Sequence, residues 1–215
     1  MSHDQAVRQA VFSADGRRIA TASDDHTAAV WDAMSGRRLA RLPHDNRDGV
    51  VVREATFSSD GALVLTASSD HTARVWDAAT GRELARFRHG NAVLSAAFFP
   101  DGRRVLTASS DHTARIWDVA SGRELFLLQR ANLMRQAAVS PDGTRAITAA
   151  DDAARLWDVS ALSVGSPELN SRVCVWLPAD QHRFGSEEIQ SDALVRDVFL
   201  AGAGGNRSVC EGSQR

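Results

Sequence analysis

The chain has 215 residues, of which 43% are hydrophobic, enough for one or two domains with a hydrophobic core. Its 25 basic and 27 acidic residues leave a formal charge of -2, so no global positive field would hold a nucleic-acid backbone or an anionic membrane. No apolar run approaches the roughly 18 residues of a membrane span, and the N-terminus lacks a signal-peptide pattern. We therefore expect a soluble, cytoplasmic protein that binds neither nucleic acid nor membranes.

The dipeptide Trp-Asp recurs along the chain at a nearly constant spacing. Its four copies stand at 31–32, 76–77, 117–118 and 157–158, so successive Trp residues are 45, 41 and 40 positions apart. Asp-Gly recurs in step at 15–16, 60–61, 101–102 and 142–143. A period of about 40–45 residues that ends in Trp-Asp is typical of the blades of a β-propeller.

Turn residues divide each unit into short segments. A first apolar run ends near Asp-Gly, a second run ends at Ser-x-Asp-His-Thr in the first three units, and a third run ends in Trp-Asp. A fourth strand is predicted at about 37–42, 82–88 and 123–128. We therefore expect an all-β fold of four four-stranded units over residues 1–161, with unit boundaries at 3–43, 44–88, 89–129 and 130–161.

Residues 3 to about 160 resemble the WD40-repeat family, of the bacterial type, because four Trp-Asp units recur in phase. The resemblance implies that a His, a Thr, an Asp and the Trp of each unit form a hydrogen-bonded network. The sets are His3, Thr21, Asp25 and Trp31; His44, Thr66, Asp70 and Trp76; His89, Thr107, Asp111 and Trp117; and Thr148, Asp152 and Trp157. A buried indole N–H needs a partner, so we assign these residues to the fold and not to an active site. Arg130 takes the place of the fourth His, and we expect the last blade to be less well held.

Ser, Asp and His stand side by side in the repeated turns, as in Ser69-Asp70-His71. Adjacent residues on a tight turn cannot align a nucleophile, a base and an orienting acid, so we expect no catalytic site there. The equivalent His26, His71 and His112 would diverge around a propeller axis, whereas zinc requires nitrogens about 2 Å from one ion. We predict no enzyme activity, no metal site and no cofactor.

Three arginines mark a candidate binding site for a protein partner. Arg8, Arg53, Leu94 and Arg135 stand seven residues before the Asp-Gly aspartates, where family geometry places the start of the innermost strand. Arginine suits a bidentate grip on a carboxylate or phosphate, so an acidic or phosphorylated segment would dock there. The alternative is that these arginines only solvate the rim. His26, His71 and His112 are expected on the same face and are further candidates for partner binding.

The ring is not expected to close within this chain. Trp157-Asp158 runs into residues 159–165 without the Gly-Arg-x-Leu pattern of the earlier units, and no closing strand is visible at either end. Relatives carry about seven units, and an open arc leaves edges and blade faces uncovered. Two explanations stay open: the chain is part of a longer propeller, or another copy of itself completes the arc.

The repeat stops before residue 162, and residues 162–215 are predicted to form a helical tail. One helix would begin at 166–168 and place Leu169, Val173, Trp176 and Leu177 on one face, and a second would span 191–200. About the last 12 residues are expected to be disordered. Whether Cys174 and Cys210 pair stays open. The tail weakly resembles the C-terminal ends of bacterial multi-domain WD-repeat signalling proteins.

These observations favour a non-enzymatic protein–protein interaction scaffold or sensor module that binds its partners through the loop face of the propeller. The alternative is a regulatory or substrate-binding propeller that forms part of a larger enzyme, such as an NTPase, a kinase or a protease-like signalling protein. An enzyme within this chain should show acid, base or metal-ligand residues that interrupt the repeat, and the sequence shows none.

Overall fold

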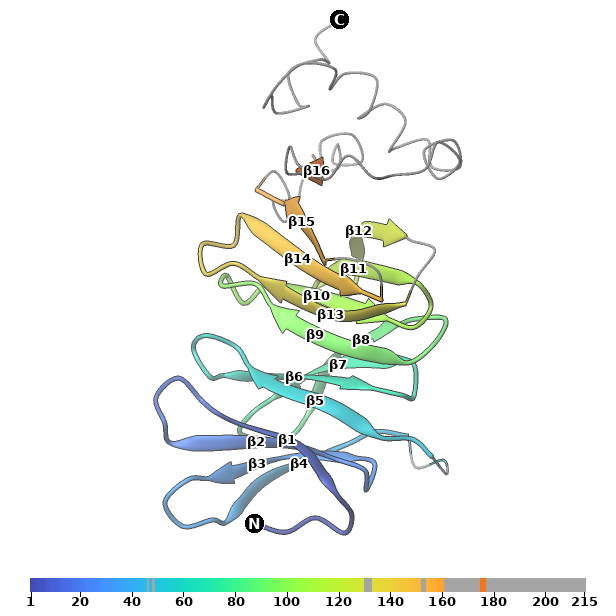
Figure 1. The fold of residues 1–215 in the computed structure, drawn as a ribbon. Helices are drawn as coiled ribbons and strands as arrows, with labels where there is room; N and C mark the ends of the chain where they lie inside the picture. Colours follow the sequence, from blue (N-terminus) through green and yellow to red (C-terminus); the bar gives the residue numbers. More distant parts are fainter. Residues whose placement is uncertain (46, 48, 130–132, 152–153, 161–174, 177–215) are drawn as a thin grey trace, which may run out of the picture.

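The computed structural model describes residues 1–45, 47, 49–129, 133–151, 154–160 and 175–176 (Figure 1). Within these ranges every regular element is a β-strand, which confirms the all-β prediction for this part of the chain. None of the described residues belongs to a helix of the length and apolar character that crossing a membrane requires.

The described strands pair into four antiparallel sheets, here called blades one to four, in which the strand order follows the chain. Blade one contains β1 (Val7–Phe12), β2 (Arg18–Ser23), β3 (Thr27–Asp32) and β4 (Arg38–Pro43). Blade two contains β5 (Val52–Phe57), β6 (Leu63–Ser68), β7 (Thr72–Asp77) and β8 (Glu83–Arg88). Blade three contains β9 (Val93–Phe98), β10 (Arg104–Ser109), β11 (Thr113–Asp118) and β12 (Glu124–Gln129). Blade four contains β13 (Met134–Val139), β14 (Arg145–Ala150), β15 (Ala154–Asp158) and β16 (Val175–Trp176).

Side-chain hydrogen bonds build the recurring Asp-Gly turns between the first and second strands. In blade one, Ser13 Oγ donates to the Asp15 carboxylate at 2.5 Å, and the same carboxylate accepts the N–H of Arg17 at 3.0 Å. Gly16 closes the turn at a φ of 69°, a left-handed conformation that glycine adopts without a steric penalty. Blades two and four repeat these contacts. Because the contacts are local, the Asp-Gly pattern predicts where each first strand ends.

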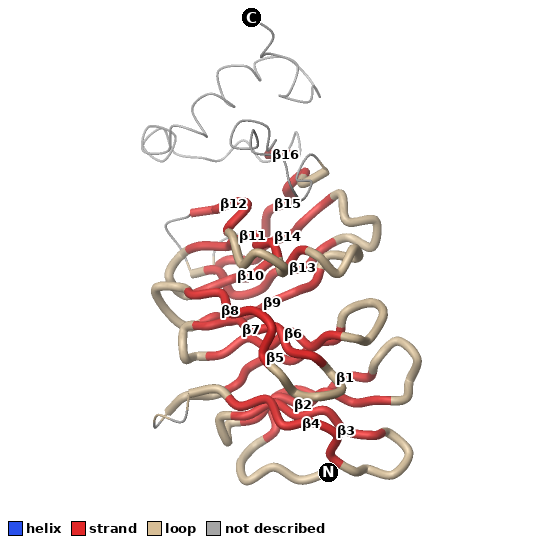
Figure 2. Tube along the Cα trace, turned by 180° about the vertical axis from the view of Figure 1, so that it is seen from behind, coloured by secondary structure: helices blue, strands red, loops and turns tan. Residues whose placement is uncertain are grey.

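The blades stack face to face in chain order, so blades one and four lie at opposite ends of the molecule (Figure 1, Figure 2). The first strands of successive blades, β1, β5, β9 and β13, contact one another, and each second strand contacts the first strand of the next blade. Among the described strands, no contact of similar extent joins the outer strands β4, β8 and β12. The first strands therefore form the inner edge of an arc from which the blades radiate.

Apolar clusters fill the spaces between neighbouring blades. The first cluster joins Ala20, Val30 and Leu42 of blade one to Val52 and Trp76 of blade two. Two further clusters repeat this arrangement between blades two and three and between blades three and four. Blades two and three thus bury both of their apolar faces, and the stack of blades provides the core that no single sheet could provide.

The outer edge of blade four differs from the sequence-based expectation. Val175 and Trp176 form β16, which pairs with β15 in the position of the missing fourth strand. These two residues, within the predicted helix, form a strand here, because the outer edge of β15 offers backbone groups that an extended segment can satisfy. The rest of residues 162–215, including the other predicted helical positions, both cysteines and the last 12 residues, lies outside the described part of the chain.

Candidate functional site

A chain of side-chain hydrogen bonds crosses the interior of blade two. Trp76 Nε1 donates to Thr66 Oγ1 at 2.9 Å, and His44 Nε2 lies 2.8 Å from the same hydroxyl. His44 Nδ1 lies 2.8 Å from a carboxylate oxygen of Asp70. An indole only donates and a carboxylate only accepts, so a neutral His44 that donates from Nδ1 and accepts at Nε2 completes the chain.

Blades one and three contain the same arrangement, and blade four contains part of it. The Trp–Thr, His–Thr and His–Asp distances are 2.8, 2.7 and 2.8 Å for Trp31, Thr21, His3 and Asp25, and 2.9, 2.8 and 3.1 Å for Trp117, Thr107, His89 and Asp111. In blade four, Trp157 Nε1 donates to Thr148 Oγ1 at 2.9 Å. Arg130 and Asp152 lie outside the described residues.

Burial fixes the charge states of this network. Desolvation lowers the pKa of His44 and lowers that of His89 to about 4. Burial alone would raise the pKa of the aspartates, but hydrogen bonds from Thr and His side chains outweigh it and lower the pKa of Asp25 and Asp111 to about 2. The pKa of Asp70 is lowered further, with additional help from the charge of a nearby arginine. Near neutral pH the networks of blades two and three therefore pair neutral imidazoles with ionised carboxylates.

The order of Asp70, His44 and Thr66 resembles that of a hydrolase triad, but the hydroxyl is not available for catalysis. Thr66 is 0% exposed, and its oxygen already accepts the indole N–H of Trp76. A substrate carbonyl could not reach it, and the same chain of contacts occurs in three blades. The adjacent Ser69 and His71 lie in a surface turn and take no part in this chain.

Arg74 extends the blade-two network, although the sequence analysis did not single it out. Its side chain is only 4% exposed, and Nη2 donates to Asp70 at 2.5 Å and to Asp45 at 2.9 Å, while Nη1 donates to Glu83 at 3.3 Å. The strand register places Arg74 opposite Thr66. The charges of one buried arginine and three carboxylates thus meet beside the Trp76 ring, 6.0 Å from the guanidinium.

The other blades vary this feature. Arg115 occupies the equivalent position in blade three and contacts Asp111 and Glu124 at 3.4 and 3.0 Å, whereas Ala29 stands there in blade one. The recurrence of Thr-Ala-Arg at 72–74 and 113–115, in register with the Trp-Asp units, was the signal that could have identified these arginines.

The candidate partner-binding arginines all occupy β-bulges. Pairing between the first and second strands skips Arg8, Arg53 and Arg135, and it skips Leu94 at the same position of blade three. A bulged residue has no cross-strand partner, and its side chain is turned away from the regular pleat. The four inner strands therefore present one re-aimed side chain each near the inner edge of the arc.

Two of these arginines are already neutralised. Arg8 grips Asp24 with two hydrogen bonds, at 2.6 Å from Nε and 2.7 Å from Nη2. Arg135 donates one hydrogen bond, from Nε, to Asp151. Both aspartates lie in the turn between the second and third strands, sixteen residues after their arginine. These contacts place the bulges and those turns on one face of the stack, here called the loop face.

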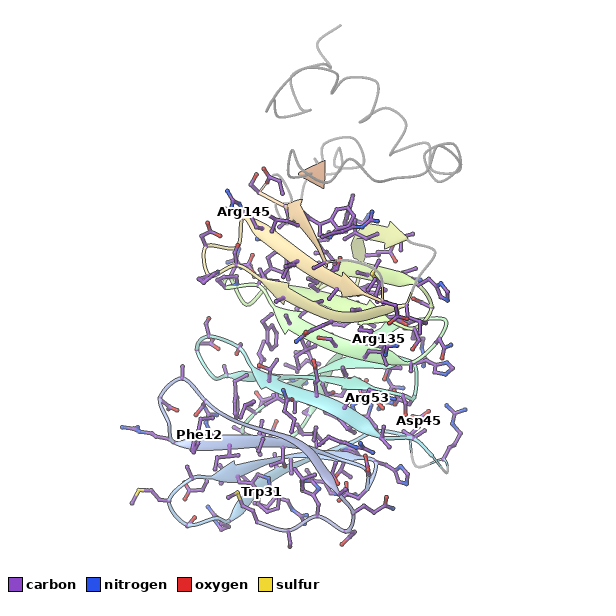
Figure 3. All side chains as sticks on the ribbon, viewed as in Figure 1. Phe12, Trp31, Asp45, Arg53, Arg135 and Arg145 are labelled. Carbon is purple, nitrogen blue, oxygen red and sulfur yellow. The ribbon has the colours of Figure 1, made fainter. Side chains whose placement is uncertain are left out.

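Arg53 is the exception on the loop face. The residue sixteen positions later is Ser69, whose hydroxyl accepts the N–H of Val51 at 2.8 Å. Arg53 is exposed, and none of the described residues forms a hydrogen bond or an ion pair with its guanidinium. In Figure 3, Arg53, Arg135 and Asp45 project from one side of the stack, whereas Phe12 and Arg145 lie on the opposite side. Blade two therefore offers a cation that no described residue pairs, where blades one and four have ion pairs.

The three turn histidines do not come together. His26, His71 and His112 have left-handed φ angles of 66°, 68° and 69°, and each belongs to a different blade. His26 is partly buried and donates from Nδ1 to the carbonyl of Val50 at 2.5 Å, while His71 and His112 are exposed. Within the described ranges, no group of three or more His, Cys, Asp or Glu residues could hold a metal ion.

Stacked four-stranded antiparallel sheets, each held by a Trp–Thr hydrogen bond next to the Trp-Asp turn, define a module of the β-propeller class. The family model of WD40, described as WD domain, G-beta repeat, matches residues 1–32, 36–77 and 81–118, which is more than half of the chain. The protein therefore belongs to the WD40-repeat family, as its in-phase Trp-Asp units predict. Comparison with curated proteins gave no match. WD40 repeats generally mediate protein–protein interactions and are typically non-catalytic.

Proposed function

We propose that this protein is a non-enzymatic scaffold or sensor module whose loop face binds an acidic or phosphorylated segment of a partner protein, with Arg53 as the anchor. The observation that carries the proposal is the exposed guanidinium of Arg53 on a β-bulge, which none of the described residues pairs, in a position where Asp24 and Asp151 neutralise the equivalent arginines of blades one and four.

Chemistry favours an anionic ligand at this position. A guanidinium presents its donors in a planar fork that matches the two oxygens of a carboxylate or a phosphate. Arg8 and Arg135 already donate to aspartates of the same blade. Their positive charges therefore contribute little to the electrostatic field that a ligand in solution would meet. A ligand at Arg53 would instead meet a donor group for which none of the described carboxylates competes.

The proposal is tested by the binding of a labelled protein to an array of short peptides that are acidic, phosphorylated or neutral. Phosphorylated peptides and their unphosphorylated acidic counterparts distinguish the two sources of negative charge. Arg53→Ala is expected to weaken binding about tenfold, as the loss of a central arginine anchor commonly does. Asp24→Asn, which releases Arg8 from its ion pair, is expected to strengthen binding.

Arg145→Ala is the matched control, because Arg145 is exposed on the opposite side of the stack (Figure 3). It should bind like the wild type. The proposal is overturned if no acidic or phosphorylated peptide binds, or if the Arg53 and Arg145 variants lose affinity to the same extent.

A further inference from the structure

The contact between neighbouring blades is built from two different faces. The trailing face of a blade packs on the following blade, and in blade one it is formed by Ala20, Ala22, Ala28 and Val30. The leading face packs on the preceding blade, and in blade two it is formed by Val52, Ala55, Val64 and Trp76. This junction of a trailing face with a leading face occurs three times in the molecule.

The end blades each leave one of these faces uncovered among the described residues. On the leading face, Val52, Val93 and Met134 are at most 1% exposed, whereas the equivalent Val7 of blade one is 50% exposed. On the trailing face, Ala20, Leu65 and Leu106 are at most 1% exposed, whereas Ile147 of blade four is 42% exposed. The two ends of the arc therefore present the two complementary halves of one repeated interface.

A polar contact repeats at the same three junctions. The residue after each bulge accepts a backbone N–H from the next blade: Gln9 Oε1 from Ala55 at 2.7 Å, Glu54 Oε2 from Ala96 at 3.1 Å and Ser95 Oγ from Ala137 at 3.3 Å. The fourth such residue is Gln136, which is exposed in blade four. The fourth such N–H belongs to Ala10, which lies opposite Thr21 as Ala55 lies opposite Thr66.

We propose that two copies of this chain join head to tail, with blade four of each copy packed on blade one of the other, to close a ring of eight blades. Each junction would bring Ile147 and its neighbours onto the face of Val7 and place Gln136 beside the N–H of Ala10. A contact between two different faces forms a closed assembly only if the rotation closes, and two arcs related by a twofold axis close it with two identical junctions. Eight blades lie within the range of four to eight that propellers adopt.

This assembly uses the end faces and not the loop face, so it is independent of the proposed function. The test is the mass of the full 215-residue chain in solution, measured by light scattering over a dilution series. We expect twice the 23.2 kDa of the single chain. A mass that stays at 23.2 kDa, or one that grows beyond two copies, overturns the closed ring.

Two substitutions test the orientation of the copies. Val7→Glu and Ile147→Glu place a charge on the leading and trailing end faces at positions that are already half exposed, so each chain should still fold. Each substitution acts at both junctions and is expected to raise the dissociation constant of the dimer about 100-fold or more.

The pattern of effects excludes other dimers. If two copies met through blade one alone, only Val7→Glu would disrupt them, and if they met through blade four alone, only Ile147→Glu would do so. Leu84→Glu is the matched control, because Leu84 is 40% exposed on the outer strand β8 of a blade that is covered on both faces. The Leu84 and Arg53 variants should remain dimeric, and their dissociation would contradict the proposed junction.

Discussion

Blade two and blade four share the buried Trp–Thr hydrogen bond but differ in what surrounds it. In blade two, His44, Asp70 and the buried Arg74 extend the contact toward the surface. In blade four, the described residues contribute Thr148 and Trp157. Both sheets nevertheless have the same register. The comparison teaches that the Trp–Thr contact recurs with the same strand register in both blades, and we expect the ionised network of blade two to add stability and to make that stability depend on pH.

The largest difference between blades in the free energy of unfolding is expected from removal of the network aspartate, Asp70 in blade two. Asp70→Ala would leave the guanidinium of Arg74 buried beside an unsatisfied His44, and we expect a loss of about 3 kcal/mol in the free energy of unfolding. Asp25→Ala is the matched change in blade one, where Ala29 replaces the arginine, and we expect it to cost about 1–2 kcal/mol. Urea unfolding measures both variants. Equal losses of stability in the two variants would mean that the buried charge of Arg74 is not stabilised by Asp70.

The stability of blades two and three should fall in mild acid. Burial holds the pKa of His89 at about 4, below its ordinary value of about 6.5. The folded protein therefore keeps this imidazole neutral after the unfolded chain has begun to bind a proton. Stability is lost as the pH falls from about 6.5 to about 4, and we expect a loss of about 3 kcal/mol from this one residue.

The control for this pH dependence is His89→Asn, which removes the titrating group. Urea unfolding at a series of pH values should give a shallower decline for the variant than for the wild type. Parallel declines would show that His89 does not carry the effect.

A smaller difference separates the two threonines that receive the indole N–H. Thr66→Val would remove a partner from both Trp76 and His44, whereas Thr148→Val would, among the described residues, remove one from Trp157. We expect losses of about 2 and about 1 kcal/mol, since each unsatisfied buried group costs on the order of 1 kcal/mol. The urea midpoints of the two variants provide the comparison. A larger loss of stability from Thr148→Val than from Thr66→Val would contradict this prediction.

The features that could be predicted from the sequence are those set by local chemistry. The Ser–Asp–Gly turns and the Trp-Asp period fix strand ends and blade number, because their hydrogen bonds join residues only a few positions apart. The pairing of β16 with β15 was not predictable, because a two-residue strand is selected by a vacant edge and not by its own pattern. The family pattern indicated the location of Arg8, Arg53 and Arg135, but not that two of them are neutralised.

Whether an arginine of the loop face is neutralised depends on a β-bulge and on a turn sixteen residues later in the chain. The arginine and the turn residue come together only once the blade has folded. The residue at one position of the turn then decides whether the arginine is paired. Asp24 and Asp151 form ion pairs with Arg8 and Arg135, whereas Ser69, at the equivalent position of blade two, binds the backbone N–H of Val51 instead. Blade two thus combines the buried Arg74 network with an arginine on the loop face that no described residue pairs.

The most direct measurement of this claim uses Ser69→Asp, which gives blade two the carboxylate that blades one and four have. Binding of the variant to the acidic and phosphorylated peptides would be compared with that of the wild type and of Arg53→Ala. We predict that Ser69→Asp lowers affinity about as far as Arg53→Ala, roughly tenfold, while the melting temperature stays within a few degrees of the wild type. Wild-type affinity in the Ser69→Asp variant would contradict the assignment of Arg53 as the anchor.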